Sequence, residues 1–297
     1  MRLFMTGSNS FIGQVFLDQC DARGVTVTGV DLTPSRRGDC HVADIRDPGI
    51  AERIPEGVDA VVHLAALSRD GDCRDNALPC FSANVLGTLN LMAAARARQA
   101  KQFIFASSEW VYDRFENNVE KREDDLIDVA ALQSEYALSK LVSEVNLRQQ
   151  YRHGFCPVTI LRFGIIYGPR RDNWSAVESL LNGVATREEV TVGALATSRR
   201  FVYVTDIADA VLAAVGHAGF DIFNIQGSRS VTLGEVIETS KALLGKTPRI
   251  VESAPATPNV RLVSGEKAKR LLGWEPRVDL ETGLRQVARL LDLELVS

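Results

Sequence analysis

The sequence has little of what metal sites, disulfide frameworks, membrane spans and nucleic-acid interfaces require. Its five cysteines are dispersed without a CxxC pair, and it has only four histidines. This pattern argues against a zinc site or a disulfide framework and indicates reduced thiols in the cytoplasm. No uninterrupted apolar run approaches the ~20 residues that cross a bilayer, so we expect no membrane association. The formal net charge of −4 shows no basic excess of the kind that nucleic-acid-binding proteins carry.

The chain nevertheless has the apolar content of a folded protein, with 45% hydrophobic residues among 297. Its first part alternates short β-rich runs with helical patterns, which is typical of a parallel sheet with crossover helices. The predicted strands are 3–6, 25–30, 60–64, 102–106 and 157–163, and the predicted helices are 11–20, 80–98 and 134–151.

The pattern changes after residue 169 to irregular, charge-rich sequence with shorter elements. Strands at 201–204 and 221–225, with a helix at 206–215, are expected to return to the sheet domain. Three more helices are predicted at 232–244, 264–272 and 279–291. We therefore predict an α/β fold in which a doubly wound parallel sheet carries a smaller lobe.

A glycine turn follows the first predicted strand, with Gly7 at the strand end and Gly13 at the start of a helix. Such a turn lets a pyrophosphate approach the backbone at a helix N-terminus. The middle glycine of the usual motif is Ser10, whose hydroxyl could donate to the phosphate. By itself this motif also fits an ordinary loop.

An acidic residue, Asp31, ends the second predicted strand. A carboxylate there accepts hydrogen bonds from ribose hydroxyls and repels a 2′-phosphate, which favours NAD over NADP. Arg36 and Arg37 follow in the next loop and could instead hold a 2′-phosphate.

Tyr136 and Lys140 stand four residues apart in a predicted helix and therefore share one of its faces. An ammonium beside a phenol favours the phenolate, so we expect a lowered pKa for Tyr136, which could then act as a base toward an alcohol. Ser107 and Ser108 follow the strand at 102–106, at the sheet edge where open α/β sheets bind ligands.

The motifs, taken in order, resemble the extended short-chain dehydrogenase/reductase family, the NAD-dependent nucleotide-sugar epimerases and dehydratases. The resemblance covers nearly the whole chain. Besides the glycine turn and Asp31 it rests on segments 43–47, 62–66, 84–88, 107–112, 136–140, 161–169, 199–206 and 268–274. It implies a modified Rossmann domain that binds NAD (1–168 and 201–226) and a substrate-binding lobe (169–200 and 227–297).

The resemblance also implies residue roles. Tyr136 would be the catalytic base, Lys140 would serve both the phenol and the nicotinamide ribose, and Ser108 would bind the reacting oxygen. Asn84 would support the active site. The cofactor would contact Gly7, Ser10, Phe11, Ile12, Gly13, Asp31, Asp44, Ile45, Leu64, Ala65 and Ala66. The substrate would contact Ser107, Ser108, Arg199 and Arg261, the two arginines holding its diphosphate.

Several positions depart from the family pattern besides Ser10: Asp113, Ile165 and Arg200. Glu109 follows Ser108 at the place where related dehydratases carry an acid. Trp110 stands where those enzymes carry a base, so only half of the dehydratase pair is present.

We therefore expect a nucleotide-sugar epimerase that transiently oxidises the sugar C4 hydroxyl. The alternatives are a 4,6-dehydratase that uses Glu109, a 4-ketoreductase or dehydrogenase, and a non-catalytic NAD sensor, which would not need Tyr136. We also expect no metal ion, and a homodimer formed through the apolar helix at 86–95 and the helix that carries Tyr136.

Overall fold

The computed structural model describes residues 1–35, 37–112, 115 and 119–296. A seven-stranded sheet in the order β11-β6-β5-β4-β1-β2-β3 forms its centre, and every neighbouring pair is parallel. Its strands are β1 (Arg2–Thr6), β2 (Thr26–Asp31), β3 (Cys40–Val42), β4 (Ala60–His63), β5 (Phe103–Ser108), β6 (Val158–Phe163) and β11 (Phe220–Ile225). The prediction of a doubly wound α/β fold is confirmed.

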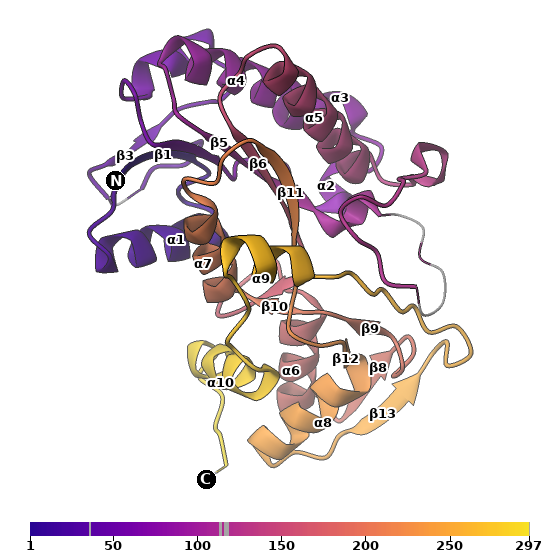
Figure 1. The fold of residues 1–297 in the computed structure, drawn as a ribbon. Helices are drawn as coiled ribbons and strands as arrows, with labels where there is room; N and C mark the ends of the chain where they lie inside the picture. Colours follow the sequence, from indigo (N-terminus) through magenta and orange to yellow (C-terminus); the bar gives the residue numbers. More distant parts are fainter. Residues whose placement is uncertain (36, 113–114, 116–118, 297) are drawn as a thin grey trace.

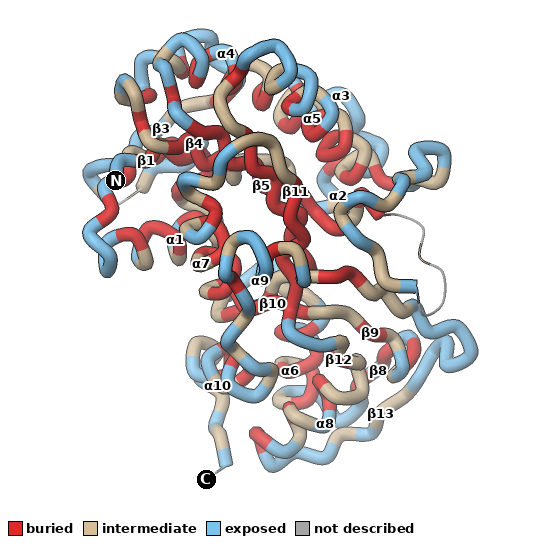
Figure 2. The backbone as a smooth tube through the Cα atoms, viewed as in Figure 1, coloured by how far each residue is buried: buried red, intermediate tan, exposed pale blue. Residues whose placement is uncertain are grey.

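Helices cover both faces of this sheet (Figure 1). The helices α1 (Phe11–Ala22) and α7 (Val204–Ala214) pack on one face, and α4 (Gly87–Ala97) and α5 (Glu135–Arg152) pack on the other. Side chains alternate along β1, so that Leu3 and Met5 enter the first core and Phe4 enters the second. The strands are buried almost throughout (Figure 2), as sheets covered on both faces are.

The strand order reverses between β1 and β4, because the chain proceeds outward from β1 to β3 and then in the other direction from β4 to β11. Ligands of open α/β sheets bind at the carboxyl ends of the strands at such a reversal. The glycine turn after β1 and the loop after β4 meet there.

The helical stretch Ala77–Ala97 comprises α3 (Ala77–Phe81), the π-helical turn η2 (Ser82–Leu86) and α4. It is the one stretch of the described chain long and apolar enough by composition to cross a bilayer, which the sequence prediction overlooked because polar residues interrupt it. Nearly half of it is buried in the protein, and Thr88 bonds with His63 inside the fold. These contacts identify it as a core helix of the sheet domain.

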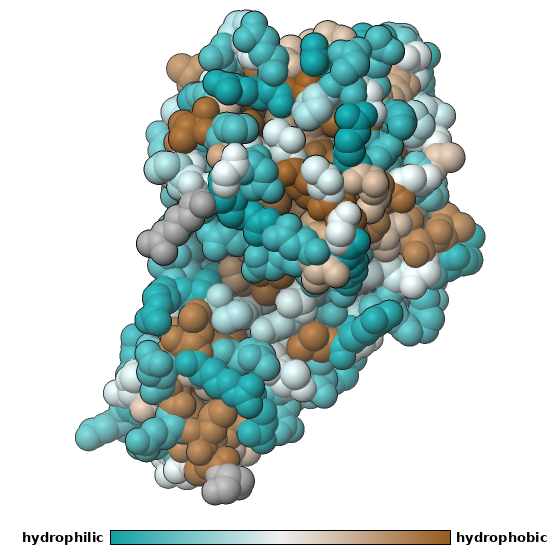
Figure 3. All heavy atoms as spheres, turned by 90° about the vertical axis from the view of Figure 1, so that its left-hand side faces the viewer, coloured by the Kyte–Doolittle hydropathy of each residue, from teal (hydrophilic) through white to brown (hydrophobic). Residues whose placement is uncertain are grey.

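A smaller lobe lies below the sheet in Figure 1 and has its own hydrophobic core. It contains α6 (Ala176–Thr186), α8 (Leu233–Leu244) and α10 (Leu280–Leu290). Two-stranded pairs join β8 (Glu189–Val192) to β13 (Arg249–Glu252), β9 (Ser198–Arg199) to β12 (Val231–Thr232), and β7 (Ile166–Tyr167) to β10 (Val202–Tyr203). Seen from the side, its surface carries apolar residues among hydrophilic ones (Figure 3).

The remaining helices are short. The helix α9 (Glu266–Leu272) packs on β11 and α7, and Trp274 after it enters the sheet core. This helix therefore packs with the sheet domain, although the predicted substrate-binding lobe of 227–297 includes it. The others are α2 (Asp70–Cys73) and the 3₁₀ turns η1 (Pro48–Arg53), η3 (Glu109–Val111) and η4 (Val129–Ala131).

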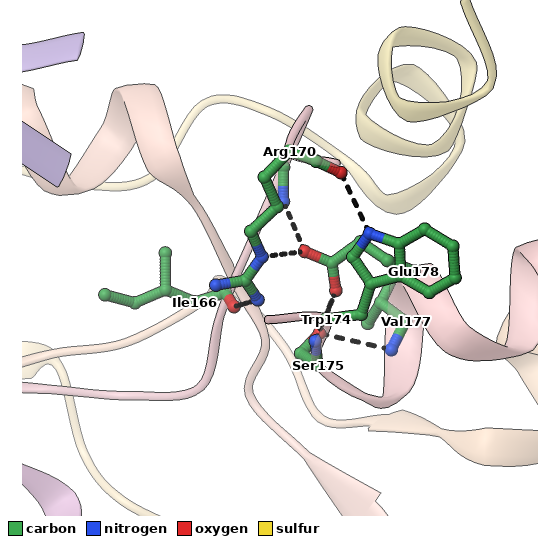
Figure 4. A network of polar contacts seen from close by, with 7 residues as sticks. Ile166, Arg170, Trp174, Ser175, Val177 and Glu178 are labelled. Atoms are coloured by element: carbon green, nitrogen blue, oxygen red, sulfur yellow. Dashed lines mark hydrogen bonds and ion pairs between the residues drawn. The ribbon is translucent and has the colours of Figure 1, made fainter. Parts of the chain in front are cut away.

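A buried carboxylate joins the lobe to the sheet domain (Figure 4). Glu178, on α6, accepts hydrogen bonds from the Gly168 amide at 3.1 Å and from Arg170 Nε at 2.8 Å. The Arg170 guanidinium in turn lies 4.7 Å from the centre of the Phe11 ring, at the N-terminus of α1. This network connects the core of the lobe to the glycine turn.

Candidate active site

The glycine turn is closed tightly enough to require its glycines. Gly7 has a φ of +76°, and a Cβ atom there would lie 2.9 Å from the Ala65 amide nitrogen. A Cβ at Gly13 would lie 2.1 Å from the Gly7 carbonyl oxygen. The backbone after β1 and the predicted cofactor residues Leu64 and Ala65 are therefore in direct contact, which produces a cradle at the N-terminus of α1.

Ser10 has a different role from the one that its sequence position suggested. Its hydroxyl donates to the Gly7 carbonyl at 2.7 Å and accepts from the Gly13 amide at 3.1 Å. The hydroxyl oxygen thus caps α1, and the hydroxyl proton is engaged by the Gly7 carbonyl and is not available to a pyrophosphate. The first amides of α1, at Phe11 and Ile12, have no partner within the helix and can receive an anion.

Asp31 lies beside this turn at the end of β2. Its Oδ2 accepts from the Asn9 amide at 3.0 Å, and its Oδ1 accepts from the Thr33 amide and hydroxyl. These bonds aim a carboxylate at the position of an adenosine ribose. Arg37 pairs with Asp18, Asp21 and Asp39 and is therefore not free for a 2′-phosphate, whereas Arg36 lies outside the described residues.

The loop after β3 carries Asp44 and Ile45. Arg46 forms a forked ion pair with Asp44, which lowers the pKa of that carboxyl. Ile45 packs on Gly87, and Asn90 donates to the Ile45 carbonyl at 2.7 Å. The loop is thus held against α4, beside the cradle.

Asn84, in the π-helical turn, connects the loop after β4 to the catalytic helix. It exchanges hydrogen bonds with the backbone of Leu67, accepting at 2.8 Å and donating at 3.0 Å, and it donates to Ser139 Oγ at 2.9 Å. Such π turns occur frequently at functional sites. The predicted support by Asn84 thus has a physical basis in these bonds, and Ala66 lies in the loop that they hold.

Tyr136, Ser108 and Lys140 converge from α5 and β5. The Tyr136 phenol lies near enough to Ser108 for that hydroxyl to lower its pKa, and Lys140 Nζ lies 5.9 Å from the centre of the Tyr136 ring. Lys140 is buried and donates to the Ala106 carbonyl at 2.8 Å. The three side chains therefore form one group at the carboxyl end of the sheet.

The pKa of Tyr136 differs from the sequence expectation. Burial raises it to about 12, and the Ser108 hydroxyl opposes this only in part. Burial also lowers the pKa of Lys140 to about 8. The expected lowering for Tyr136 is wrong for the chain by itself, because desolvation of the phenolate outweighs the opposing effect of Ser108.

Ser107 is buried at the end of β5 and bonds with a neighbouring helix. Successive residues of a strand point to opposite faces, and Ser107 Oγ donates to Glu144 on α5 at 2.5 Å. Glu144 also forms a buried ion pair with Arg162 at 2.6 Å. The proton of the Ser107 hydroxyl is therefore engaged in this internal network, and contact of Ser107 with the substrate stays a prediction.

Beyond Ser108 lies a buried polar cluster. Glu109 is only 2% exposed, and its Oε1 has no hydrogen-bond partner. Arg199 and Arg261 face it, and their charges oppose the raised pKa that burial gives the carboxyl. The two predicted diphosphate ligands therefore lie together, next to Ser108.

Gln226 was missed in the sequence. It follows β11, and its buried side-chain nitrogen and oxygen both lack partners, although it faces Glu109. Its place directly after a parallel strand could have identified it from the sequence, as the same reasoning identified Ser108.

Of the residues that depart from the family pattern, Arg200 pairs with Glu120 at 2.7 Å and Ile165 packs against the core of the lobe. Asp113 lies outside the described residues.

The arrangement fits a dinucleotide. The cradle at Gly7 and Gly13 excludes side chains, the free amides of α1 suit a pyrophosphate, and Asp31 suits a ribose. In the part of the chain that the structure describes, no group of three or more His, Cys, Asp or Glu side chains is placed to hold a metal ion.

Known proteins resemble the chain over nearly its whole length. The model of the NAD-dependent epimerase/dehydratase family matches residues 3–225. A putative UDP-glucose 4-epimerase of Methanocaldococcus jannaschii is 28% identical over 96% of both chains. UDP-glucuronic acid decarboxylase 3 of Arabidopsis thaliana is 27% identical over 96% of this chain and 87% of its own. The crystal structure of Thermus thermophilus UDP-glucose 4-epimerase with NAD superposes with a TM-score of 0.84 at 26% identity, covering 98% and 99% of the two chains.

Proposed function

Because the chain belongs to the NAD-dependent epimerase/dehydratase family, and NAD is therefore its cofactor, we propose that it is a UDP-sugar 4-epimerase. The family and the relatives show a nucleotide-sugar enzyme of the epimerase or decarboxylase type. The observation that supports hydride-transfer chemistry on a nucleotide sugar is the convergence of Ser108, Tyr136 and Lys140 beside a polar cluster that contains Arg199 and Arg261.

In this reaction the chain's own groups handle the proton of the sugar C4 hydroxyl. The Tyr136 phenolate takes that proton, and the Ser108 hydroxyl donates a hydrogen bond to the same oxygen. NAD, when bound at the cradle, supplies the acceptor and later the donor of a hydride. The phenolate needs nearby positive charge because burial opposes it, and Lys140 is the ammonium next to the ring.

Inversion at C4 requires that the sugar present its opposite face within the site. Arg199 and Arg261 suit a diphosphate, because guanidinium groups recognise phosphate oxygens with paired hydrogen bonds. If the two arginines hold the diphosphate, the sugar ring remains free to rotate about its bond to the diphosphate. The C4 hydroxyl can then re-form with inverted configuration while Tyr136 gives back its proton.

A 4,6-dehydratase is the less favoured reading of this site. Removal of water needs an acid and a base on the sugar, and only Glu109 is a carboxyl group here, since an indole follows it at Trp110. A net dehydrogenase or ketoreductase uses the same three groups, so only product analysis separates it from an epimerase.

The test is incubation of the purified protein with UDP-glucose, UDP-galactose and UDP-glucuronic acid, followed by mass spectrometry and proton NMR. An epimerase yields a new isomer of unchanged mass without added cofactor. Loss of water would indicate a dehydratase, and loss of carbon dioxide a decarboxylase. A product that differs by two hydrogens and needs added cofactor would indicate a dehydrogenase. Any of these last three outcomes would overturn the proposal.

We also propose a homodimer in the cytoplasm. Leu78, Leu86 and Val145 expose 81%, 58% and 52% of their surface on the adjoining segments α3, η2 and α5. Exposed apolar residues on adjacent helices suit a two-fold contact between copies. All five cysteines are free thiols, which suits a reducing compartment.

A further inference from the structure

Four buried polar atoms beside Ser108 have no partner at hydrogen-bond distance, although Gln226 lies near enough to Glu109 to favour the charged form of that carboxyl. The four atoms are Oε1 of Glu109, Nε of Arg261, and both the nitrogen and the oxygen of the Gln226 side chain. Buried polar groups in folded proteins are nearly always paired, so a cluster of unpaired ones indicates a polar ligand. The four atoms come from three separate segments and meet at one place, which makes them part of one site.

The position of this cluster relates it to the sugar. Ser108 and Tyr136 bind the reacting hydroxyl at one end, and Arg199 and Arg261 suit the diphosphate at the other. Glu109 directly follows Ser108 and also faces both arginines. In a nucleotide sugar the ring lies between its reacting hydroxyl and its diphosphate, so Glu109 and Gln226 are placed along the ring.

We propose, resting on the UDP-sugar function above, that Glu109 and Gln226 select sugars with neutral hydroxyl substituents and reject uronic acids. The unpaired Glu109 oxygen accepts a hydrogen bond from a sugar hydroxyl, and the Gln226 amide can donate or accept another. A carboxylate on the sugar would face the Glu109 carboxylate in a buried site. Like charges so placed cannot both stay ionised, so a uronic acid binds only when Glu109 carries a proton.

The two arginines do not remove this conflict. Among the described residues they are the charged groups that face Glu109. Arg199 is held by the carbonyl groups of Ser198 and Asn259 at 2.7 and 2.6 Å. Arg261 lies 5.3 Å from the Trp110 ring centre and 5.2 Å from that of Phe115. The diphosphate brings about two negative charges to these two cations, so a uronate adds a charge that they cannot neutralise.

The test is calorimetric titration of the NAD-loaded enzyme with UDP, UDP-glucose and UDP-glucuronic acid at several pH values from acidic to alkaline. We expect UDP-glucose to bind at least ~10-fold more tightly than UDP-glucuronic acid at the alkaline end of the series. This ratio should fall as pH falls, because protonation of Glu109 relieves the repulsion. In Glu109→Gln the ratio should approach one and lose its pH dependence.

Glu238→Gln is the matched control, because it removes a carboxylate that is 71% exposed and pairs with Lys241 on α8. Its ratio should equal that of the wild type. A wild-type ratio near one at every pH, or a preference that persists in a folded Glu109→Gln, overturns the selection proposal. The wild-type pH series decides the matter without the variant if Glu109→Gln does not fold. No binding of UDP would overturn the proposed function and this inference together.

Discussion

Replacing Lys140 by Met should stabilise the protein at neutral pH while it removes catalysis. The pKa of Lys140 falls from 10.5 to about 8 because the ammonium is buried. Such a shift corresponds to roughly 3 kcal/mol by which the fold disfavours the charged lysine. The lost hydrogen bond to the Ala106 carbonyl offsets about 1 kcal/mol of this gain. The net stabilisation of Lys140→Met should be about 2 kcal/mol at pH 7.

The pH dependence of the unfolding free energy gives an independent test of the sign of this stability change. Between pH 8 and pH 10.5 the unfolded chain holds the Lys140 proton more tightly than the folded chain does. The wild type therefore gains stability from this group as pH rises through that interval. Above pH 10.5 Lys140 is uncharged in both the folded and the unfolded chain, so burying it no longer costs free energy. Lys140→Met should then be less stable than the wild type by about 1 kcal/mol, the contribution of the lost hydrogen bond.

Urea unfolding of both proteins, freed of bound nucleotide, at a series of pH values measures this difference. Subtracting the two curves removes the titration of other groups, such as Cys20 and Cys156, whose pKa values burial raises. The reasoning would be refuted if the difference in unfolding free energy did not change sign across the pH series, or if the variant were less stable than the wild type at pH 7. Turnover should be lost throughout, since a buried charge kept at such a cost indicates function.

Three other predictions concern the proposed function. Tyr136→Phe should lower turnover about 10²-fold or more and leave NAD binding nearly intact, since it removes only the proton-transfer group. Steady-state kinetics and NAD titration measure these two effects, and near-normal turnover would contradict the prediction. NAD should bind at least ~10-fold more tightly than NADP because Asp31 repels a 2′-phosphate, and equal affinities in calorimetry would exclude this explanation. Leu86→Asp should convert the dimer to a monomer in light scattering because it places a charge in the proposed apolar contact; a wild type that is already monomeric would disprove the dimer.

Local patterns in the sequence were sufficient to predict the framework of the fold. The seven-stranded sheet follows from apolar runs that alternate with amphipathic helices, and six of its seven strands were predicted at nearly their observed places. The missing strand, β3, is only three residues long and has two exposed side chains, so it shows no apolar run. Helix α6 was also missed, although Ser175 and Glu178 form a capping box at its start.

Spacing alone also brought together the residues whose chemistry depends on one element or one turn. Gly7 and Gly13 lie within a single turn, and Tyr136 and Lys140 lie on a single helix face. Their proximity follows from helix geometry and needs no knowledge of the rest of the chain.

Only the tertiary structure decided how each side chain is used, because burial and long-range partners set its chemistry. Ser107 and Ser108 are neighbours in sequence, yet Glu144 on α5 binds one while the other meets Tyr136. Desolvation, which no spacing reveals, reversed the expected pKa shift of Tyr136. Glu109 and Gln226 are more than a hundred residues apart in the sequence, and the folded sheet alone brings them together at the sugar's proposed place.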